Sequence, residues 1–353
     1  MHILVTGGTG LLGTRLIPHL VRNGHQVPAL TRSATSAARL RALGAVPVIA
    51  DLDSPGALAL PPIDAVVHAA ALFRFSGPRE PFARVNVEGT ARMLAAAERA
   101  GAKRFVHISA AGIIMDEAGT PIRNADERAP THPHHFSAYL ASKARAESLV
   151  LEADTSSMHT LALRPPALWG PGDPFSRALP KAISTGQFAF INRGEYAFDT
   201  CHVDNVIEAI DCALARGEGG RAYFITDREK LTFREFVALL AGIEGLSIEK
   251  LRSIPYGMAS VLGRVMDAAW TLASRNDDPP LSRSMIRMIG REFSVNDGCA
   301  QRELGYVGTT TRAMGVRSYT PSAAEALAHR PASHAAVVRG HTRPGANVTS
   351  SGS

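Results

Sequence analysis

Two residues, Tyr139 and Lys143, are of the types and at the spacing that proton transfer requires. Side chains four residues apart on a helix lie on one face, with Cβ atoms about 5–6 Å apart. An ammonium group beside a phenol favours the phenolate, so we expect Lys143 to lower the pKa of Tyr139 from its usual value of about 10. Such a phenol exchanges a proton with a carbonyl or an alcohol near neutral pH. Because helices bring many Tyr–Lys pairs together, the pair needs support from the rest of the chain.

A glycine-rich turn near the N-terminus predicts a site for a dinucleotide. Residues 2–6 are expected to form a strand, Gly7, Gly10 and Gly13 a tight turn that opens a helix, and residues 26–31 a second strand. Each missing side chain lets backbone N–H groups approach a pyrophosphate or lets the helix pack closely on the strand. A strand before the turn and a helix after it form the context that makes this glycine spacing specific.

Strands continue to alternate with helices up to about residue 165. The expected strands are 46–50, 64–71, 103–109 and 160–164, and the expected helices are 80–100 and 137–152, the second of which carries the Tyr–Lys pair. This alternation is typical of a parallel, doubly wound sheet. The sequence therefore predicts an α/β fold with a Rossmann-type dinucleotide-binding domain at residues 1–165, whose core also receives later crossing segments.

Shorter elements follow and predict a smaller, mainly helical substrate-binding lobe at residues 166–315. The expected elements are helices near 203–216, 232–241, 255–273 and 281–290, and a strand at 222–226. The helix at 255–273 is apolar but contains Arg264 and Asp267, so an amphipathic helix over a substrate cavity is expected rather than a membrane span. Residues 320–353, rich in Ala, Ser, His and Pro, are expected to be a disordered tail.

Composition and charge exclude several classes of protein. The net charge is +6, yet the basic residues are dispersed, so no nucleic-acid partner is expected. Cys201, Cys212 and Cys299 lie far apart without a CxxC pair, which fits a reducing compartment. The N-terminus leads directly into a strand rather than a signal peptide, so a cytoplasmic location is expected.

A histidine cluster is the one pattern that suggests a metal. His132, His134 and His135 are adjacent, but no further ligand stands at helical or strand spacing from them. A polar loop beside the active site, in which one histidine contacts substrate or relays a proton, is the better interpretation. We therefore predict no metal site.

Further motifs occur in a fixed order along the chain. They are TGGTGLLG at 6–13, Asp51-Leu52, His-Ala-Ala at 68–70, NVEGT at 86–90, FVHIS at 105–109, YxxSK at 139–143, Arg164-Pro165 and WGPGD at 169–173. In this order they resemble the extended short-chain dehydrogenases/reductases, the epimerase/dehydratase superfamily, over roughly residues 1–315.

The resemblance implies roles for the residues of the pair. Tyr139 would be the general acid/base, and Lys143 would hold the nicotinamide ribose and lower the pKa of the tyrosine. A serine hydroxyl would polarise the substrate carbonyl while hydride moves between that carbon and C4 of the nicotinamide. Relatives carry two small hydroxyl residues after the strand, whereas Ser109 is followed here by Ala110. Either Ser109 supplies the hydroxyl from a shifted register, or the site works without one.

The choice of cofactor depends on the end of the second strand. An acidic residue there accepts from the ribose 2′-OH and selects NAD, whereas an arginine accommodates a 2′-phosphate. This chain has Arg32 and Ser33 and no acid at that point, so NADP(H) is expected to be preferred, with NAD(H) possible. Together with the resemblance, this predicts a cofactor site formed by Gly7, Thr9, Gly10, Leu11, Leu12, Gly13, Arg32, Ser33, Asp51, Leu52, Ala69, Ala70, Asn86, Tyr139, Lys143 and Pro165.

The second lobe predicts the class of substrate. Phe198 stands where nucleotide-sugar enzymes of the resembled family carry an arginine for the diphosphate, a bidentate task that suits arginine. Residues 203–206 (VDNV), 279–283 (PPLSR) and 301–306 (QRELGY) resemble the 3β-hydroxysteroid dehydrogenase-like branch. An NAD(P)-dependent oxidoreductase is predicted, acting on a ketone or secondary alcohol of an apolar molecule that is sterol-like, β-keto acyl or polyketide/flavonoid-like.

Two alternatives remain open from the sequence. One is a nucleotide-sugar epimerase or dehydratase, as in much of the resembled superfamily. The other is a non-catalytic dinucleotide-binding or redox-sensing protein, which Ala110 in the usual serine position would suit. The resemblance also implies a possible homodimer.

Overall fold

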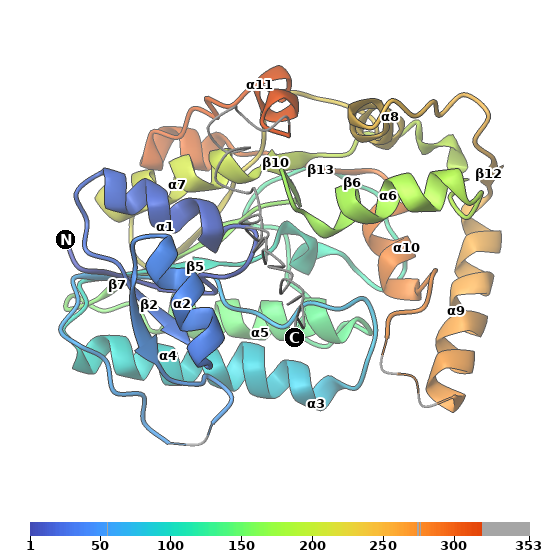
Figure 1. The fold of residues 1–353 in the computed structure, drawn as a ribbon. Helices are drawn as coiled ribbons and strands as arrows, with labels where there is room; N and C mark the ends of the chain where they lie inside the picture. Colours follow the sequence, from blue (N-terminus) through green and yellow to red (C-terminus); the bar gives the residue numbers. More distant parts are fainter. Residues whose placement is uncertain (55, 274, 276, 320–353) are drawn as a thin grey trace, which may run out of the picture. The chain divides into compact units, whose positions relative to one another are not determined.

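The computed structural model describes residues 1–319 apart from 55, 274 and 276, and these residues form one compact unit. Its centre is a seven-stranded sheet in the order β11-β7-β5-β4-β1-β2-β3, in which every neighbouring pair is parallel (Figure 1). The strands are β1 (Ile3–Thr6), β2 (Pro28–Thr31), β3 (Val46–Ile49), β4 (Ala65–His68), β5 (Arg104–Ile108), β7 (His159–Arg164) and β11 (Arg221–Phe224). The predicted Rossmann-type doubly wound fold is confirmed.

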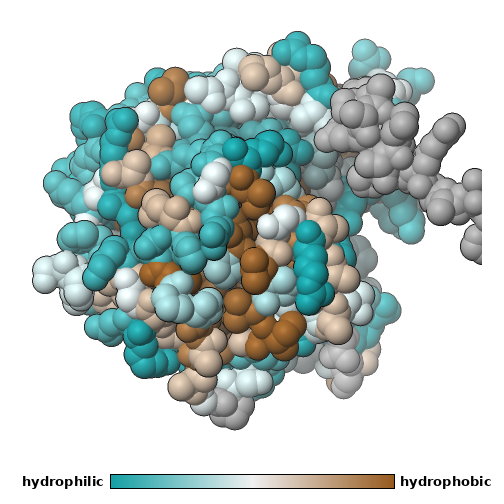
Figure 2. All heavy atoms as spheres, turned by 60° about the vertical axis from the view of Figure 1, so that its left-hand side comes forward, coloured by the Kyte–Doolittle hydropathy of each residue, from teal (hydrophilic) through white to brown (hydrophobic). Residues whose placement is uncertain are grey.

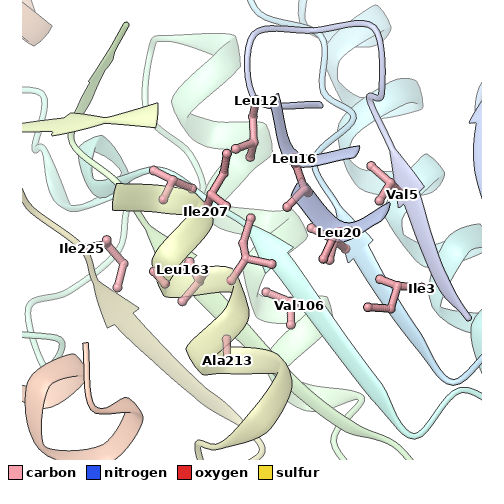
Figure 3. Packing of buried hydrophobic residues seen from close by; sticks show 14 of the residues in the cluster. Ile3, Val5, Leu12, Leu16, Leu20, Val106, Leu163, Ile207, Ala213 and Ile225 are labelled. Atoms are coloured by element: carbon pink, nitrogen blue, oxygen red, sulfur yellow. The ribbon is translucent and has the colours of Figure 1, made fainter. Parts of the chain in front are cut away.

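Helices cover both faces of the sheet because its central strands are apolar on both sides. Ile3 and Val5 of β1 face α1 (Gly13–Arg22) and α7 (Val203–Ala215), and α2 (Ala34–Ala42) adds Leu40 to the same cluster. Figure 3 shows these side chains converging from helices and strands. Leu4, between the two, points to the other face, where α4 (Gly89–Arg99) and α5 (Ala138–Glu152) pack.

The predicted helix at 80–100 is divided into three parts. It begins as α3 (Arg79–Phe82), passes through the wide π-helical turn η1 (Ala83–Glu88) and continues as α4. A π-turn inserts an extra residue into the helix and is common at functional sites. The sequence analysis missed this turn because its apolar spacing is that of an ordinary helix.

The remaining elements lie outside the central sheet, several of them at the right of Figure 1. Three two-stranded parallel sheets pair β6 (Ile122–Ala125) with β13 (Phe293–Val295), β8 (Ala167–Trp169) with β10 (Thr200–His202), and β9 (Phe190–Ile191) with β12 (Ser253–Ile254). The helices are α6 (Pro174–Ser184), α8 (Phe233–Ile243), α9 (Tyr256–Leu272), α10 (Arg283–Ile289) and α11 (Arg312–Arg317). The tail expected at 320–353 lies outside the described residues.

The surface carries apolar residues in places. Figure 2 brings forward the left-hand side of Figure 1, and hydrophobic residues gather in the middle of this face with hydrophilic ones around them. The edge strand β3 exposes Val46 and Ile49, which are 62% and 63% accessible. Within the described residues, none of the helices has the length and apolar character needed to cross a membrane.

A buried ion pair fixes α5 to the sheet. Arg164 at the end of β7 donates to both carboxylate oxygens of Glu147 on α5, the shortest of these bonds measuring 2.6 Å, and both side chains are at most 4% exposed. The guanidinium also lies over the ring of Phe224, 5.4 Å from its centroid. Because each charge is removed from water, losing one partner leaves the other without compensation.

Breaking this pair is expected to destabilise the protein strongly. Glu147→Ala should lower the free energy of unfolding by about 3–5 kcal/mol, because an unpaired guanidinium remains buried. The double variant Glu147→Leu/Arg164→Met should recover most of that loss, since it buries no charge. Urea unfolding of the three proteins measures both effects, and equal losses in the single and double variants would contradict the explanation.

Candidate active site

Lys143 lies in the protein interior at the end of the sheet. Its side chain is 3% exposed, and Nζ donates to the Ile108 carbonyl at 2.6 Å and lies 3.2 Å from His107 Nε2. These contacts attach α5 to the last residues of β5. Burial lowers the pKa of Lys143 to about 8, although Glu147 opposes the shift. The lysine is therefore held by neutral acceptors rather than by a carboxylate.

Tyr139 lies one helical turn before Lys143 and is half-buried. The ring of Phe73 packs against its ring edge to face, with centroids 4.8 Å apart. Within the described part of the chain, the Tyr139 hydroxyl makes no hydrogen bond. Burial raises the pKa of Tyr139 to about 12, so the expected lowering by Lys143 is wrong for this structure. The reason is geometric: the ammonium is engaged with Ile108 and His107 instead of the phenol.

Ser109 directly follows β5 and is the next residue after Ile108, whose carbonyl binds Lys143. Its backbone N–H donates to the Leu163 carbonyl at 2.8 Å, which continues the strand pairing. Its side chain is only 5% exposed, and Oγ is buried without a partner among the described residues. Ala110 follows in extended conformation and begins the short helix η2 (Ala111–Ile114). A buried hydroxyl without a partner costs free energy unless something binds it.

Two histidines that the sequence analysis did not single out lie behind Lys143. His68 and His107 are register partners on β4 and β5, and their rings stack with centroids 5.4 Å apart. Burial lowers the pKa of His68 to about 3 and that of His107 well below its usual value, and the charge of Lys143 acts in the same direction. Both rings are therefore neutral at physiological pH. A histidine at the same strand-end position of two successive strands is the signal that could have revealed them.

His68 belongs to a chain of buried hydrogen bonds that crosses the sheet end. Its Nδ1 lies 2.9 Å from Thr6 Oγ1, and its Nε2 lies 3.0 Å from Thr90 Oγ1. Thr6 Oγ1 also accepts from the Ala70 amide at 3.0 Å. Thr90 Oγ1 donates to the Asn86 carbonyl at 2.6 Å. The chain links the strand before the glycine-rich turn with the π-turn in front of α4.

Asn86 connects this π-turn to the helix of the Tyr–Lys pair. Its side-chain amide donates to Ser142 Oγ at 2.9 Å, and Ser142 Oγ donates to the Tyr139 carbonyl at 2.8 Å. The amide oxygen of Asn86 accepts from the Leu72 N–H at 2.7 Å, in the loop that carries Phe73. Asn86 thus positions both α5 and that loop. The sequence analysis had placed it at the cofactor.

The glycine-rich turn has the shape that a dinucleotide requires. Gly7 adopts φ +73°, and a Cβ there would lie 2.9 Å from the backbone of Ala69 and Ala70, so the turn lies directly against the loop after β4. A Cβ on Gly13 would lie 2.4 Å from the Gly7 carbonyl oxygen. No side chain caps the N-terminus of α1, and its first turn holds no acid. Thr14 N–H donates to the Gly10 carbonyl and Arg15 N–H to the Leu12 carbonyl. The N–H groups of Leu11, Leu12 and Gly13 make no hydrogen bond within the described residues, so they are available to an anion such as a pyrophosphate.

The other predicted cofactor residues surround this turn. Arg32 and Ser33 follow β2, both exposed, and Ser33 Oγ caps α2 through the Ser36 amide at 3.2 Å. Asp51 is half-buried and Leu52 buried, and the Leu52 carbonyl accepts from Arg92 Nε at 2.9 Å. Of the residues predicted only by resemblance, Thr9, Leu11 and Leu12 lie in the turn before α1, and Pro165 is buried at the end of β7, accepting from the Ala111 amide at 2.9 Å.

The histidine cluster does not form a metal site in the structure. His135 is buried, its Nδ1 accepts from the Ser137 amide at 2.9 Å, and burial lowers its pKa to about 4. It thereby supports the start of α5, which Ser137 caps through the Leu140 amide. Over the described ranges, no group of three or more His, Cys, Asp or Glu side chains is arranged to hold a metal ion.

Comparisons with known proteins agree with this geometry. Residues 3–226 match the model of the NAD dependent epimerase/dehydratase family. The chain is 37% identical to a 4-hydroxy-2-methyl-3-oxo-4-farnesyl-3,4-dihydroquinoline-1-oxide ketoreductase of Stigmatella aurantiaca, over 94% of this chain and 100% of the relative. It is 33% identical to a 2-alkyl-3-oxoalkanoate reductase of Stenotrophomonas maltophilia, over 92% of this chain and 100% of that protein.

Solved structures share the fold at lower identity. A double mutant of the dTDP-glucose 4,6-dehydratase of Streptomyces venezuelae superposes with a TM-score of 0.69 at 23% identity, covering 90% of this chain and 97% of that one. At this identity the likeness concerns the fold alone.

The buried lysine is expected to make stability depend on pH. The pKa of Lys143 is about 8 in the folded protein, below its usual value of 10.5, so the folded state binds fewer protons than the unfolded state between these values. Stability from this group therefore rises with pH across that window. Replacing the lysine with an uncharged residue, as in Lys143→Met, removes the effect.

We expect the difference between the unfolding free energies of Lys143→Met and the unmodified protein to change by about 3 kcal/mol between pH 7 and pH 10.5, with the variant relatively more stable at pH 7. Urea titrations of both proteins at the two pH values measure it. The exposed Lys250→Met variant is the matched control and should show no such change. A pH-independent difference for Lys143→Met would contradict a buried ammonium.

Proposed function

The chain is an oxidoreductase that belongs to the NAD dependent epimerase/dehydratase family, and we propose that it transfers hydride between NADP(H) and the carbonyl or alcohol carbon of an apolar substrate. The observation that carries this proposal is the Tyr139 hydroxyl, half-buried and without a hydrogen bond in the described structure, one turn from a buried Lys143. Such a hydroxyl has both access to a ligand and a fixed position.

The chemistry of Tyr139 fits reduction of a ketone. A phenol with a pKa of about 12 is protonated at neutral pH, so it is ready to give its proton to a carbonyl oxygen that gains charge as hydride arrives. Lys143 lies one turn further along α5, with its ammonium bound to the Ile108 carbonyl and next to His107. A bound nicotinamide would supply the hydride, held by the turn at Gly7, the loop at Ala69 and Ala70, and Lys143.

Ser109 is the group proposed to polarise the substrate carbonyl. Its buried Oγ has no partner in the described residues, so it can donate to a ligand without losing an existing bond. This supports the first of the two readings of the Ser109-Ala110 pair. Ala110 then leaves room beside the carbonyl rather than removing the only hydroxyl.

The surroundings of Tyr139 support an apolar substrate. Phe73 packs on the tyrosine and on Phe75, with centroids 4.8 Å and 5.1 Å apart. The two relatives described above are named for a farnesylated quinoline oxide and for 2-alkyl-3-oxoalkanoates, which are ketones with hydrocarbon chains. A ketone with a long alkyl or isoprenoid group is therefore the proposed substrate class.

Two described side chains do not suit a nucleotide sugar. Phe198, in place of the diphosphate-binding arginine, is 3% exposed and packs against Phe233 and Phe236 in the apolar core. The buried Arg287 donates to the Asp116 carboxylate and carbonyl and to Thr120. The charge of Arg287 is therefore paired with Asp116 and is not free to bind a diphosphate.

Removing the proposed proton donor is expected to lower kcat strongly and to leave cofactor binding nearly unchanged. Tyr139→Phe should lower kcat by 10²–10⁴ because proton transfer is lost. The dissociation constant for NADPH, measured by fluorescence titration, should change less than about threefold. The turn at Gly7, the loop at Ala69 and Ala70, and Lys143, which are proposed to hold the cofactor, are unchanged in this variant. The assay follows NADPH absorbance with 2-alkyl-3-oxoalkanoates and isoprenoid aryl ketones.

Ser109→Ala should lower kcat by roughly 10²–10³, as loss of one donor to a developing oxyanion does, with little change in KM. Ser148→Ala, which removes an exposed hydroxyl elsewhere on α5, is the control. Unchanged turnover in Ser109→Ala would assign carbonyl polarisation to another group. Binding of NADPH without turnover on any ketone tested would instead support the non-catalytic alternative.

The preference for NADPH is proposed to depend on Arg32. This exposed guanidinium follows β2, where a 2′-phosphate would lie, and the nearby acid Asp53 is already paired with Arg84. Arg32→Ala should raise KM for NADPH by roughly 10- to 100-fold, the worth of charge-assisted hydrogen bonds, and leave NADH little affected. Equal kcat/KM with NADPH and NADH in the unmodified enzyme would show that Arg32 does not select NADPH over NADH.

A further inference from the structure

Helix α9 presents an apolar face to solvent. Met258, Val261, Leu262, Val265 and Leu272 are between 45% and 89% exposed. Successive residues of an α-helix are about 100° apart, so these five fall within one stripe roughly 100° wide along the helix. Contiguous exposed apolar surface of this kind marks an interaction site in a soluble protein.

The orientation of α9 is fixed by its inner side, where small residues allow close approach to α10 and Tyr256 packs against an apolar cluster. Ala259 and Gly263 are buried, and a Cβ on Gly263 would lie 2.5 Å from Ile286 Cδ1 and 3.2 Å from the Arg283 amide. Asp267 accepts from that same amide at 3.1 Å. Because these contacts require close approach to α10, the helix cannot turn its stripe inward. The role expected for this segment over a substrate cavity stays a prediction, and it would fall to the inner side of α9, where Tyr256, Ser260 and Arg264 line a hollow beside α10.

We propose that this face of α9 docks on the surface of a lipid bilayer that carries anionic headgroups. The helix would lie in the plane of the interface with its stripe among the acyl chains, as amphipathic helices of peripheral proteins do. This goes beyond the reductase activity proposed above and does not depend on it.

The size and shape of the face favour lipid over a second copy of the chain. At their observed exposures, the five residues offer roughly 500–600 Å² of mainly apolar surface, below the ~800 Å² that each partner of a specific protein interface buries. The stripe also lies on a single helix at one edge of the molecule (Figure 1). A bilayer accepts such a ridge without a complementary groove.

Charge around the helix also favours an anionic surface. Arg264 is exposed on α9, and Lys250 and Arg252 are exposed just before it, with Glu249 as the neighbouring acid. The acid of the helix itself, Asp267, is turned toward α10. Basic residues near a bilayer are attracted to anionic lipid, each by an amount that salt screens.

Vesicle flotation of the full chain tests the proposal. We expect the protein to float with vesicles of phosphatidylcholine and phosphatidylglycerol, and to bind at least tenfold less to pure phosphatidylcholine or at high salt. Val261→Glu/Val265→Glu should reduce binding at least tenfold, because it places charge in the acyl region. Val46→Glu/Ile49→Glu adds the same charge at the equally exposed edge strand β3 and should keep binding.

Three outcomes would overturn the proposal. The first is equal vesicle binding by the α9 and β3 variants, with circular dichroism showing both folded. The second is a dimer in light scattering that Val261→Glu/Val265→Glu converts to monomer, which would assign the face to a second copy. The third is binding that appears only after residues 320–353 are removed, which would assign the face to the chain's own C-terminal segment. Ketone reduction in solution is measured separately and should be unchanged in both variants.

Discussion

The structure around the active site depends on holding one ammonium group inside the protein. Burying Lys143 disfavours its charged form, and its pKa falls to about 8 as a result. The Ile108 carbonyl and neutral His107 accept its hydrogen bonds at the end of β5. A carboxylate in that place would hold the charge more tightly, but it would bury a second charge beside the first. Neutral acceptors keep the lysine positioned and its charge available.

The two histidines next to Lys143, His68 and His107, must also stay uncharged. The stacked rings of His68 and His107 would repel the ammonium if either were protonated, and burial prevents this by lowering both pKa values. Thr6 and Thr90 satisfy the two nitrogens of His68. Through Thr90 and Asn86, the same hydrogen bonds reach Ser142 and the backbone of Tyr139. The strand before the glycine-rich turn and the helix that carries Tyr139 are thus joined by one hydrogen-bond network.

Much of the fold could be predicted from the sequence, because local patterns determine it. Continuous apolar runs gave the central strands, and Ser137 marked the start of α5, where its side chain caps the helix. Paired prolines after Arg164 ended β7 where expected. What could not be predicted depends on register between distant segments. The pairing of His68 with His107, the π-turn at Asn86 and the engagement of Lys143 with Ile108 each require knowing which residues face each other across the sheet.

The apolar face of α9 and the loop that carries Phe73 are physically connected. The segment between α9 and α10 contains Asp278, whose carboxylate accepts from the Phe75 and Ser76 amides and from the Ser76 hydroxyl. Phe75 and Ser76 belong to the same loop as Phe73, whose ring packs against the ring of Tyr139. A ketone with a long hydrocarbon chain partitions into membranes, so an enzyme for it gains by placing the aromatic side of its site near lipid. With α9 resting on a bilayer, the Asp278 bonds would hold the Phe73 loop beside the same surface, and the substrate would reach Tyr139 without crossing water.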